Sequence, residues 1–230
     1  GTICNCTLCH TRHTSSVELA RLPTTCGQCH LGPDHSQMEI YTESKHGIMF
    51  AAQRDQLNLK APPNELTTKD MFVPTCATCH MSGINGTGVT HDPSERLSYN
   101  LFAEVTTRRP NADRAEAKMK SICLQCHTPP LVNRVYEDGA AVVKSTNEKV
   151  LAAKAIMDSL AAEGLISTNA FSQSIQFNYF DLWHYYGRTT KHAAFMGGAD
   201  YVQWHGNYPI LKHTVELKEE AAQLRKENGK

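Results

Sequence analysis

The sequence predicts a mainly α-helical protein with little or no β-structure. Three observations lead to this expectation. Short Cys-containing motifs, separated by stretches rich in Gly, Pro, Thr and Asn, occupy residues 1–130. Apolar residues recur at helical spacing from about residue 145 onward, and no segment alternates between apolar and polar residues as a half-buried strand does. We therefore expect short helices and loops in residues 1–130 and longer helices in residues 131–230, joined in one compact unit.

The motif Cys-x-x-Cys-His occurs four times in the first region. In this motif two thiols can form thioether bonds with the vinyl groups of one haem, and the histidine binds the iron. We therefore predict four covalently bound haem c groups. Their attachment residues are Cys6 and Cys9, Cys26 and Cys29, Cys76 and Cys79, and Cys123 and Cys126, with proximal ligands His10, His30, His80 and His127.

Zinc is the competing interpretation of these motifs, because Cys-x-x-Cys pairs also bind zinc. A zinc protein would combine the pairs into Cys₄ or Cys₂His₂ sites, and the histidine after every second cysteine would then have no explanation. Of the nine cysteines only Cys4 lies outside the motifs, so no disulfide framework is expected. We interpret Cys4 as an unpaired or buried thiol; a wider pair with Cys9 is the alternative.

Composition excludes some functions and indicates a compartment. Lys and Arg number 23, as do Asp and Glu, so there is no basic field that would attract nucleic acid. No apolar run approaches the ~20 residues that cross a bilayer, so no membrane span is expected. Thioether attachment of haem normally takes place outside the cytoplasm. We expect an exported protein, periplasmic or extracellular, and interpret the chain as a mature one without its signal peptide or as a fragment.

The individual elements follow in chain order. Short helical turns should carry the four motifs, with loops at Pro- and Gly-rich stretches such as 32–34 and 82–86, and a helix over 109–123 should lead into the fourth. A capping box at Ser145 and Glu148 predicts a helix start, followed by an apolar stripe and a stop at Gly164. The stripe comprises Val150, Leu151, Ala152, Ala155, Ile156 and Leu160. Residues 172–190 and 200–228 should also be helical, the latter kinked at Pro209.

Histidines beyond the motifs decide how each iron is completed. A low-spin haem needs a sixth ligand, and His or Met can supply it. Twelve histidines less four proximal ones leave eight for four irons, so we predict bis-His ligation throughout and assign the seven methionines to packing. The eight are His13, His35, His46, His91, His184, His192, His205 and His213; for His184, His205 and His213 a polar position on a helix face is the alternative.

Several stretches resemble octahaem hydroxylamine oxidoreductase. They include Thr25–His35 followed by Glu43–Gly47, the motif stretch Pro74–Met81, and His192–Tyr201. The related pentahaem cytochrome c nitrite reductase shares the same order of motifs. The resemblance covers nearly the whole chain, but only the last four haems of that superfamily. It implies haems enclosed by loops and followed by a long helical section.

The resemblance also implies distal ligands. His91 would bind the first haem, His192 the second and His46 the fourth. The third haem takes its distal ligand, in that superfamily, from an upstream segment with no counterpart here. Its ligand would then be His13, His35 or His205, or a histidine of another subunit.

One departure from the superfamily bears on activity. Its substrate binds an open-sided haem attached upstream of the matched segment, and that haem has no counterpart in this sequence. His35, preceded by Asp34, falls where those enzymes carry an active-site histidine, and Tyr185 or Tyr186 falls near their cross-linked tyrosine. Without the catalytic haem we expect His35 to be a ligand or a structural histidine.

Two functional classes follow. The first is an electron carrier with four closely stacked bis-His haems and no catalytic residue. If a neighbouring subunit supplies the missing ligand, its head-to-tail contacts build a filament of copies of the chain, which resembles the tetrahaem extracellular cytochrome nanowires. The alternative is the C-terminal tetrahaem part of a redox enzyme similar to hydroxylamine oxidoreductase or nitrite reductase. We favour the carrier, because no open haem is indicated; the sequence identifies neither electron donor nor acceptor.

Overall fold

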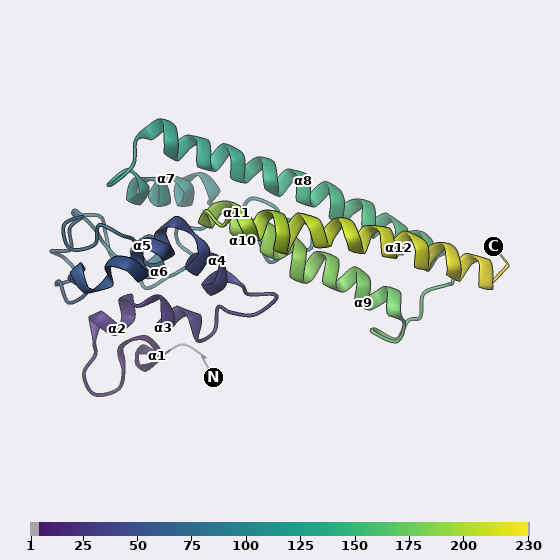
Figure 1. Ribbon diagram of the computed structural model, residues 1–230, viewed down its shortest axis with the longest axis horizontal. Helices are drawn as coiled ribbons and strands as arrows, with labels where there is room; N and C mark the ends of the chain where they lie inside the picture. Colours follow the sequence, from purple (N-terminus) through teal and green to yellow (C-terminus); the bar gives the residue numbers. More distant parts are fainter. Residues whose placement is uncertain (1–4, 230) are drawn as a thin grey trace. The chain divides into compact units, whose positions relative to one another are not determined.

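A computed structural model describes residues 5–229 of the chain (Figure 1), so the interpretation of Cys4 lies outside the described residues. The fold is mainly α, as the sequence predicts. Within residues 5–229, the only β-type pairing is an isolated bridge between Tyr99 and Arg108. The chain divides into two compact units: the first comprises the residues up to 31, 37–100 and 108–136, and the second comprises 32–36, 101–107 and the residues from 137 onward.

The first unit consists of short helices joined by loops. Several begin at side-chain caps: Asn5, Ser16 and Ser44 each accept a hydrogen bond from a backbone N–H of the first helical turn. The helices are α1 (Cys6–His10), α2 (Val17–Arg21), α3 (Pro23–Gly27), α4 (Gln37–Glu43), α5 (Lys45–Gln53), η1 (Arg54–Gln56), α6 (Cys76–His80) and α7 (Ala112–Cys123).

Buried arginines bind the loops of the first unit to its helices. Arg21 is 3% exposed, and its Nη1 donates to the carbonyls of Leu59 and Ala61 at 2.8 and 2.6 Å. Arg96 likewise donates to three backbone carbonyls, including that of Cys79 at 2.8 Å. Buried backbone carbonyls need hydrogen-bond donors. These guanidinium groups supply the donors that a neighbouring strand would supply in a sheet. A small apolar cluster packs beside them: Leu59, Ala61, Leu66, Met71, Ile84 and Ile122.

The second unit is built from longer helices, which Figure 1 shows running alongside one another. Its apolar core draws on α8, α9, η2 and α12, and includes Val150, Leu160, Leu182, Ile210 and Leu217, each with no exposed surface. Its helices are α8 (Pro129–Ala162, whose first residues belong to the first unit), α9 (Ser174–Phe180), the π-helix η2 (Asp181–Gly187), α10 (Arg188–Met196), α11 (Ala199–Val202), the π-helix η3 (Gln203–Asn207) and α12 (Tyr208–Glu227).

Helix α8 corrects one expectation from the sequence. It begins at Pro129, so Ser145 lies in its interior and the predicted capping box is wrong. A proline is favoured in the first turn, where its missing N–H costs no hydrogen bond, and residues 131–144 contain no further proline that would end the helix before Ser145. Within the predicted stripe Val150 and Leu160 are buried, but Leu151 is 48% exposed.

Two other boundaries can be compared with the sequence. The predicted stop at Gly164 is confirmed: α8 ends at Ala162, and Gly164 has a φ of +72°, which glycine adopts without strain. The kink expected at Pro209 is displaced, because Pro209 lies in the first turn of α12 and the irregular turn is the π-helix before it. Proline donates no backbone hydrogen bond, which favours such rearranged turns on its N-terminal side.

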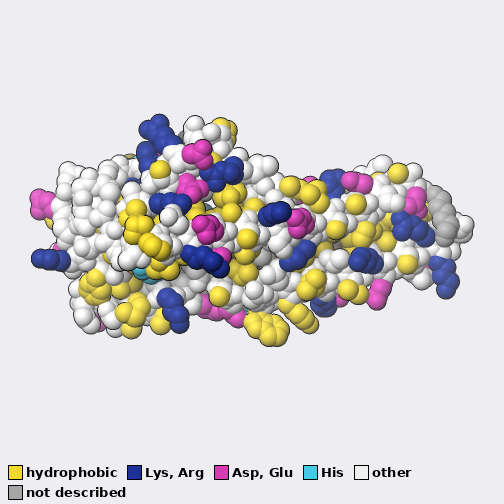
Figure 2. All heavy atoms as spheres, turned by 90° about the horizontal axis from the view of Figure 1, so that it is seen from above, with side chains coloured by type: hydrophobic (Ala, Val, Ile, Leu, Met, Phe, Trp, Pro, Cys, Tyr) yellow, Lys and Arg dark blue, Asp and Glu magenta, His cyan; other side chains and the backbone are white. Residues whose placement is uncertain are grey.

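Surface charge is mixed, as the equal numbers of acidic and basic residues suggest. On the face drawn in Figure 2, Lys and Arg are interspersed with Asp and Glu and with apolar side chains, without a large region of one sign. Among residues 5–229, no helix combines the length and the apolar character that crossing a membrane requires.

Candidate haem-binding sites

Each Cys-x-x-Cys-His motif lies at a helix or helical turn of the first unit. The first and third motifs form α1 and α6, while α3 and α7 end within the second and fourth. The N–H of His30 donates to the carbonyl of Cys26 at 3.0 Å, and that of His127 to Cys123 at 2.9 Å. A helical turn between the two cysteines puts both sulfurs on the same side, as attachment to a single porphyrin requires.

The four attachment sites follow one another through direct contacts in the first unit. Helix α1 contacts α3, α3 contacts α6, and α6 contacts α7. The thiols of Cys26 and Cys76, from the second and third motifs, are hydrogen-bonded; this bond lowers the pKa of Cys26 to about 7 and raises that of Cys76. The pKa of Cys79 is raised to about 12, chiefly by desolvation and also by nearby Cys123 and Cys126 of the fourth motif, against the opposing charge of Arg96.

His91 lies opposite the proximal histidine of the first motif. The ring centres of His10 and His91 are 6.3 Å apart, with their planes inclined by 39°. His10 Nδ1 lies 3.2 Å from the carbonyl oxygen of Ser16, which can accept a hydrogen bond from Nδ1–H. The other ring nitrogen, Nε2, is then the one that can bind a metal. An imidazole nitrogen lies about 2 Å from the metal it binds and its ring centre ~3 Å away, so two rings on one ion are ~6 Å apart.

The fourth motif has a matching pair. The ring centres of His46 and His127 are 6.0 Å apart, again inclined by 39°. His46 lies in the first turn of α5, after the Ser44 cap. Burial lowers the pKa of His46, and the nearby His127 lowers it further. The imidazole is therefore neutral near pH 7, the state in which its nitrogen lone pair can bind iron.

The third motif differs from the first and fourth. Burial lowers the pKa of His80, partly offset by a hydrogen bond with the backbone of Pro93, while the charges of Arg96 and His30 lower it further. Among the described residues, no second histidine ring faces His80 as His91 and His46 face their partners.

The other predicted distal ligands are distributed over both units. His13 is exposed between α1 and α2 in the first unit. His192 lies in α10 of the second unit, 5% exposed, with Phe102 edge-on at 5.2 Å. His205 lies in η3 of the same unit, 3.4 Å from Asp200 and stacked on Tyr201.

The second unit contains a cluster around His35, of which the sequence indicated only some members. His35 Nδ1 lies 2.9 Å from Asp34, and its ring centre is 5.4 Å from that of Phe102. Burial lowers the pKa of His184, and the charges of Arg188 and His35 lower it further, against the opposing effect of Asp34. His184 Nδ1 is buried, with no hydrogen-bond partner among the described residues.

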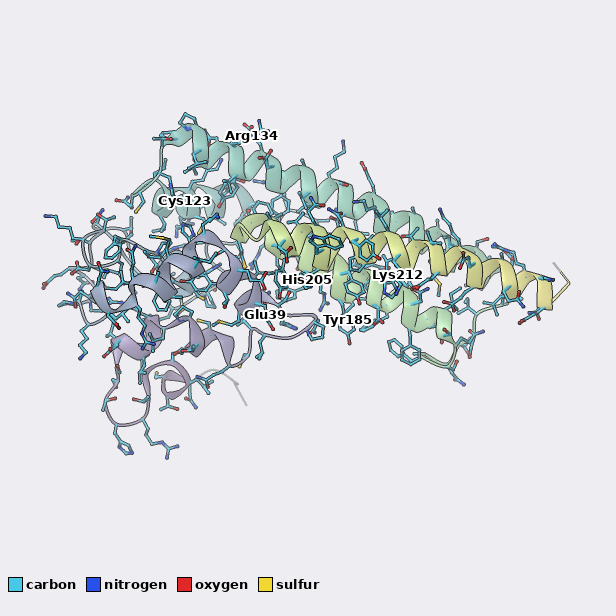
Figure 3. The ribbon with its side chains drawn as sticks, in the orientation of Figure 1. Glu39, Cys123, Arg134, Tyr185, His205 and Lys212 are labelled. Atoms are coloured by element: carbon cyan, nitrogen blue, oxygen red, sulfur yellow. The ribbon has the colours of Figure 1, made fainter. Side chains whose placement is uncertain are left out.

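Aromatic rings enclose this cluster. His184 stacks on Phe180 with ring centres 4.2 Å apart, and Tyr185 packs edge-on against His184 at 5.3 Å. Tyr185, labelled in Figure 3, thus belongs to the cluster, whereas Tyr186 stacks on His213 at 5.0 Å. The family resemblance singled out Asp34, His35 and Tyr185, but the sequence did not indicate that His184, Arg188 and Phe102 would be their neighbours.

The ligand geometry fits haem better than zinc. Within residues 5–229, His, Cys, Asp and Glu side chains are nowhere gathered in threes around a possible metal position, as a zinc site requires. A haem iron takes four nitrogens from its porphyrin and needs only two protein ligands, which is what the facing histidines offer. His10 and His91, and His46 and His127, would therefore hold the first and fourth haems.

Comparisons with known proteins identify the family of the chain. A family model described as "Seven times multi-haem cytochrome CxxCH" matches residues 2–173. A probable nitrite reductase–hydroxylamine oxidoreductase fusion protein of Kuenenia stuttgartiensis is 38% identical over 71 residues, which cover 30% of this chain and 8% of that protein.

Solved structures share the fold. A hypothetical multiheme protein matches 100% of this chain and 60% of its own, at 22% identity and a TM-score of 0.90. A chain of the reducing HAO-like protein complex of Kuenenia stuttgartiensis matches 98% of this chain and 60% of its own, at 21% identity and a TM-score of 0.85. The chain thus spans 60% of these structures and a far smaller part of the fusion protein.

Proposed function

Because the chain belongs to the family of multi-haem CxxCH cytochromes, we propose that it transfers electrons through four covalently bound haems, each with two axial histidines. The observation that carries the proposal is the two pairs of facing histidines, one at the first motif and one at the fourth, whose ring centres are 6.3 and 6.0 Å apart. We further propose an exported protein, located in the periplasm or outside the cell.

The chain's own residues support transfer rather than substrate binding. Haem supplies one-electron chemistry, and the protein positions it and adjusts its potential through ligands, burial and hydrogen bonds. Helix α1 contacts α3, α3 contacts α6, and α6 contacts α7, so the four attachment sites form a continuous series. An iron bound by two histidines offers no open position to a substrate, so saturation of all four irons favours a carrier.

The test is the ligation state of each iron. Intact mass of the native protein should exceed that of the apoprotein by four haem masses, and electron paramagnetic resonance should show only low-spin ferric haem. Replacing the distal residue, His91→Ala, should convert one haem in four to high spin. The control His213→Ala, in the second unit, should leave every haem low-spin. A five-coordinate haem in the native protein that responds to hydroxylamine or nitrite would contradict the carrier.

For the third haem we propose that a neighbouring copy supplies the distal histidine, and that the resulting head-to-tail contacts build a filament. Two observations support this: no described histidine ring faces His80, and His13 is exposed between α1 and α2. Because a head-to-tail contact does not close on itself, repeated ligation of this kind extends indefinitely.

Substitution of His13, the residue that would bind the third haem of the neighbouring copy, tests this proposal. His13→Ala should abolish filaments in electron micrographs and turn one haem in four high-spin, because assembly and ligation would be coupled. His205→Ala, at another exposed histidine, should change neither property. If the native protein stays low-spin in a dilute monomer, the third ligand lies within one chain and the filament proposal is wrong.

The alternative function is the C-terminal part of a redox enzyme acting on nitrogen compounds. It is favoured by the cluster of Asp34, His35, His184 and Arg188, which has the acid–base groups that such chemistry uses. It is also favoured by the fusion protein that the chain partly matches. Turnover of hydroxylamine or nitrite that disappears in His35→Ala, but persists in His205→Ala, would establish this alternative.

A further inference from the structure

A buried arginine holds its charge beside the third haem-attachment motif. Arg96 is 4% exposed, and its guanidinium makes three hydrogen bonds, all to backbone carbonyls. Nη1 donates to the carbonyl of Cys79 at 2.8 Å, and Nη2 donates to those of Ser82 and Gly88 at 3.0 and 2.9 Å. Cys79 is an attachment residue of the third haem, and the proximal ligand His80 follows it directly. The guanidinium therefore lies beside the position of that haem.

These hydrogen bonds leave the charge of Arg96 without a carboxylate in direct contact. A carbonyl oxygen is neutral, so it satisfies an N–H group without cancelling the charge. None of the ion pairs among the described residues includes Arg96, and the adjacent Glu95 is paired with Lys118. Near the fourth motif, by contrast, the cation Lys120 is paired with Glu116 at 2.8 Å. The third motif is thus distinguished by a buried cation that no ion pair neutralises.

A haem propionate is the other carboxylate that Arg96 could meet. Arginine binds a carboxylate most strongly through two parallel N–H groups, and each of the two guanidinium edges that offer such a pair includes an N–H of Nη2. In Arg96, Nη2 already donates to the carbonyls of Ser82 and Gly88, which occupies both of its N–H groups. Neither edge is open to a propionate, so the charge stays uncompensated when haem is bound.

A fixed positive charge stabilises the reduced state of a nearby redox centre, and burial preserves this effect because solvent ions screen a buried charge less. Building on the proposed electron transfer through four haems, we propose that Arg96 gives the third haem the highest reduction potential of the four, so that an electron held by the protein rests there. Helix α6, which carries the third motif, contacts both α3 and α7. This haem is therefore placed to receive an electron from the second or the fourth.

Redox titration of the native holoprotein, followed by haem absorbance, tests the role of the charge. Arg96→Gln should lower the highest of the four reduction potentials by ~59 mV or more, which is ~10-fold in the equilibrium constant of a one-electron couple. The other three potentials should move less, because the Coulomb energy falls with distance. Arg96→Lys keeps a cation but not the planar fork, and it should change the same constant by less than ~3-fold.

The matched control is Arg21→Gln. Arg21 is 3% exposed and also donates to two loop carbonyls, but these belong to Leu59 and Ala61, outside the motifs. The control should lose comparable hydrogen bonds and leave the highest potential unchanged. An unchanged potential in Arg96→Gln would overturn the proposal. So would an equal fall in Arg21→Gln or Arg96→Lys, because the effect would then come from lost hydrogen bonds rather than from charge.

A second variant decides the matter if Arg96→Gln loses haem or unfolds, which the haem-to-protein ratio and far-ultraviolet circular dichroism reveal. The side chain of Glu95 is 33% exposed, and its negative charge acts on Arg96. Glu95→Gln removes that anion and should raise the highest potential; no rise would contradict the proposal. Electron paramagnetic resonance of the same samples reports the proposed bis-His ligation independently. A high-spin third haem would refute that ligation and leave the expected effect of Arg96→Gln unchanged.

Discussion

The two units reach their folded state by different means. In the first unit four helices have only five residues, the longest, α7, has 12, and the largest apolar cluster contains six buried residues. In the second unit α12 has 20 residues, and the core cluster contains nine buried residues. Isolated helices shorter than ~12–15 residues are marginal in water. We therefore infer that the first unit is stabilised largely by the groups bound to it, and the second unit by its own packing.

All four haem-attachment motifs lie in the first unit, and we infer that haem supplies the apolar surface which its sequence lacks. Backbone groups of its loops are satisfied by buried arginines rather than by extended regular structure, as Arg21 and Arg96 show. In the first unit, then, the same haem groups would supply both stability and function. In the second unit, stability comes from the packing of apolar side chains and does not depend on the groups that carry function.

The largest expected effect is loss of one haem from the first unit. The double substitution Cys76→Ala/Cys79→Ala removes the attachment of the third haem, next to both the second and the fourth motifs. Hydrogen exchange should become fast throughout the first unit, while the core residues of α12 stay protected, because they pack against protein side chains of the second unit. Cys4→Ala, outside the motifs, is the control. Equal loss of protection in both units would show that they fold as one.

A packing substitution sharpens the comparison from the other side. Leu217 has no exposed surface and packs in the core of the second unit, so Leu217→Ala should reduce the free energy of unfolding by about 2–5 kcal/mol. Leu151→Ala, at an exposed position of the same unit, should cost under ~0.5 kcal/mol. Denaturant titration followed by far-ultraviolet circular dichroism measures both. Every haem should remain low-spin in Leu217→Ala; a high-spin fraction would mean that this core also positions ligands.

The smallest effect is a pH dependence confined to the second unit. His213 hydrogen-bonds Asn178 and stacks on Tyr186; burial lowers its pKa, Lys212 lowers it further, and Glu216, Asp181 and Glu220 oppose the shift. The folded state thus prefers neutral His213. Its contribution is fully present above the unfolded pKa of about 6.5 and is lost as pH falls through the folded value.

Unfolding midpoints of the native protein should accordingly fall between pH 7 and pH 5 by more than those of His213→Gln, which keeps a hydrogen-bonding side chain but does not titrate. Parallel pH profiles for the two proteins would assign the dependence to other groups.

Local chemistry explains what could be predicted from the sequence alone. The four Cys-x-x-Cys-His motifs, the mainly α fold and the end of α8 at Gly164 each depend on residues adjacent in the chain. The same reasoning failed at Ser145, because a capping box has meaning only where a helix begins, and α8 had already begun at Pro129. Local signals cannot show that a preceding segment is also helical.

Tertiary structure decided which distant side chains meet. It brought His91 to His10 and His46 to His127, pairs that the sequence suggested only through a family resemblance. It also joined Asp34 and His35 to His184 and Arg188, and it left Leu211 and Val215 of α12 exposed while Ile210 and Leu217 of the same helix are buried. The physical reason is that motif chemistry resides in a few neighbouring residues, whereas ligand pairing and burial depend on loop closures across the whole chain.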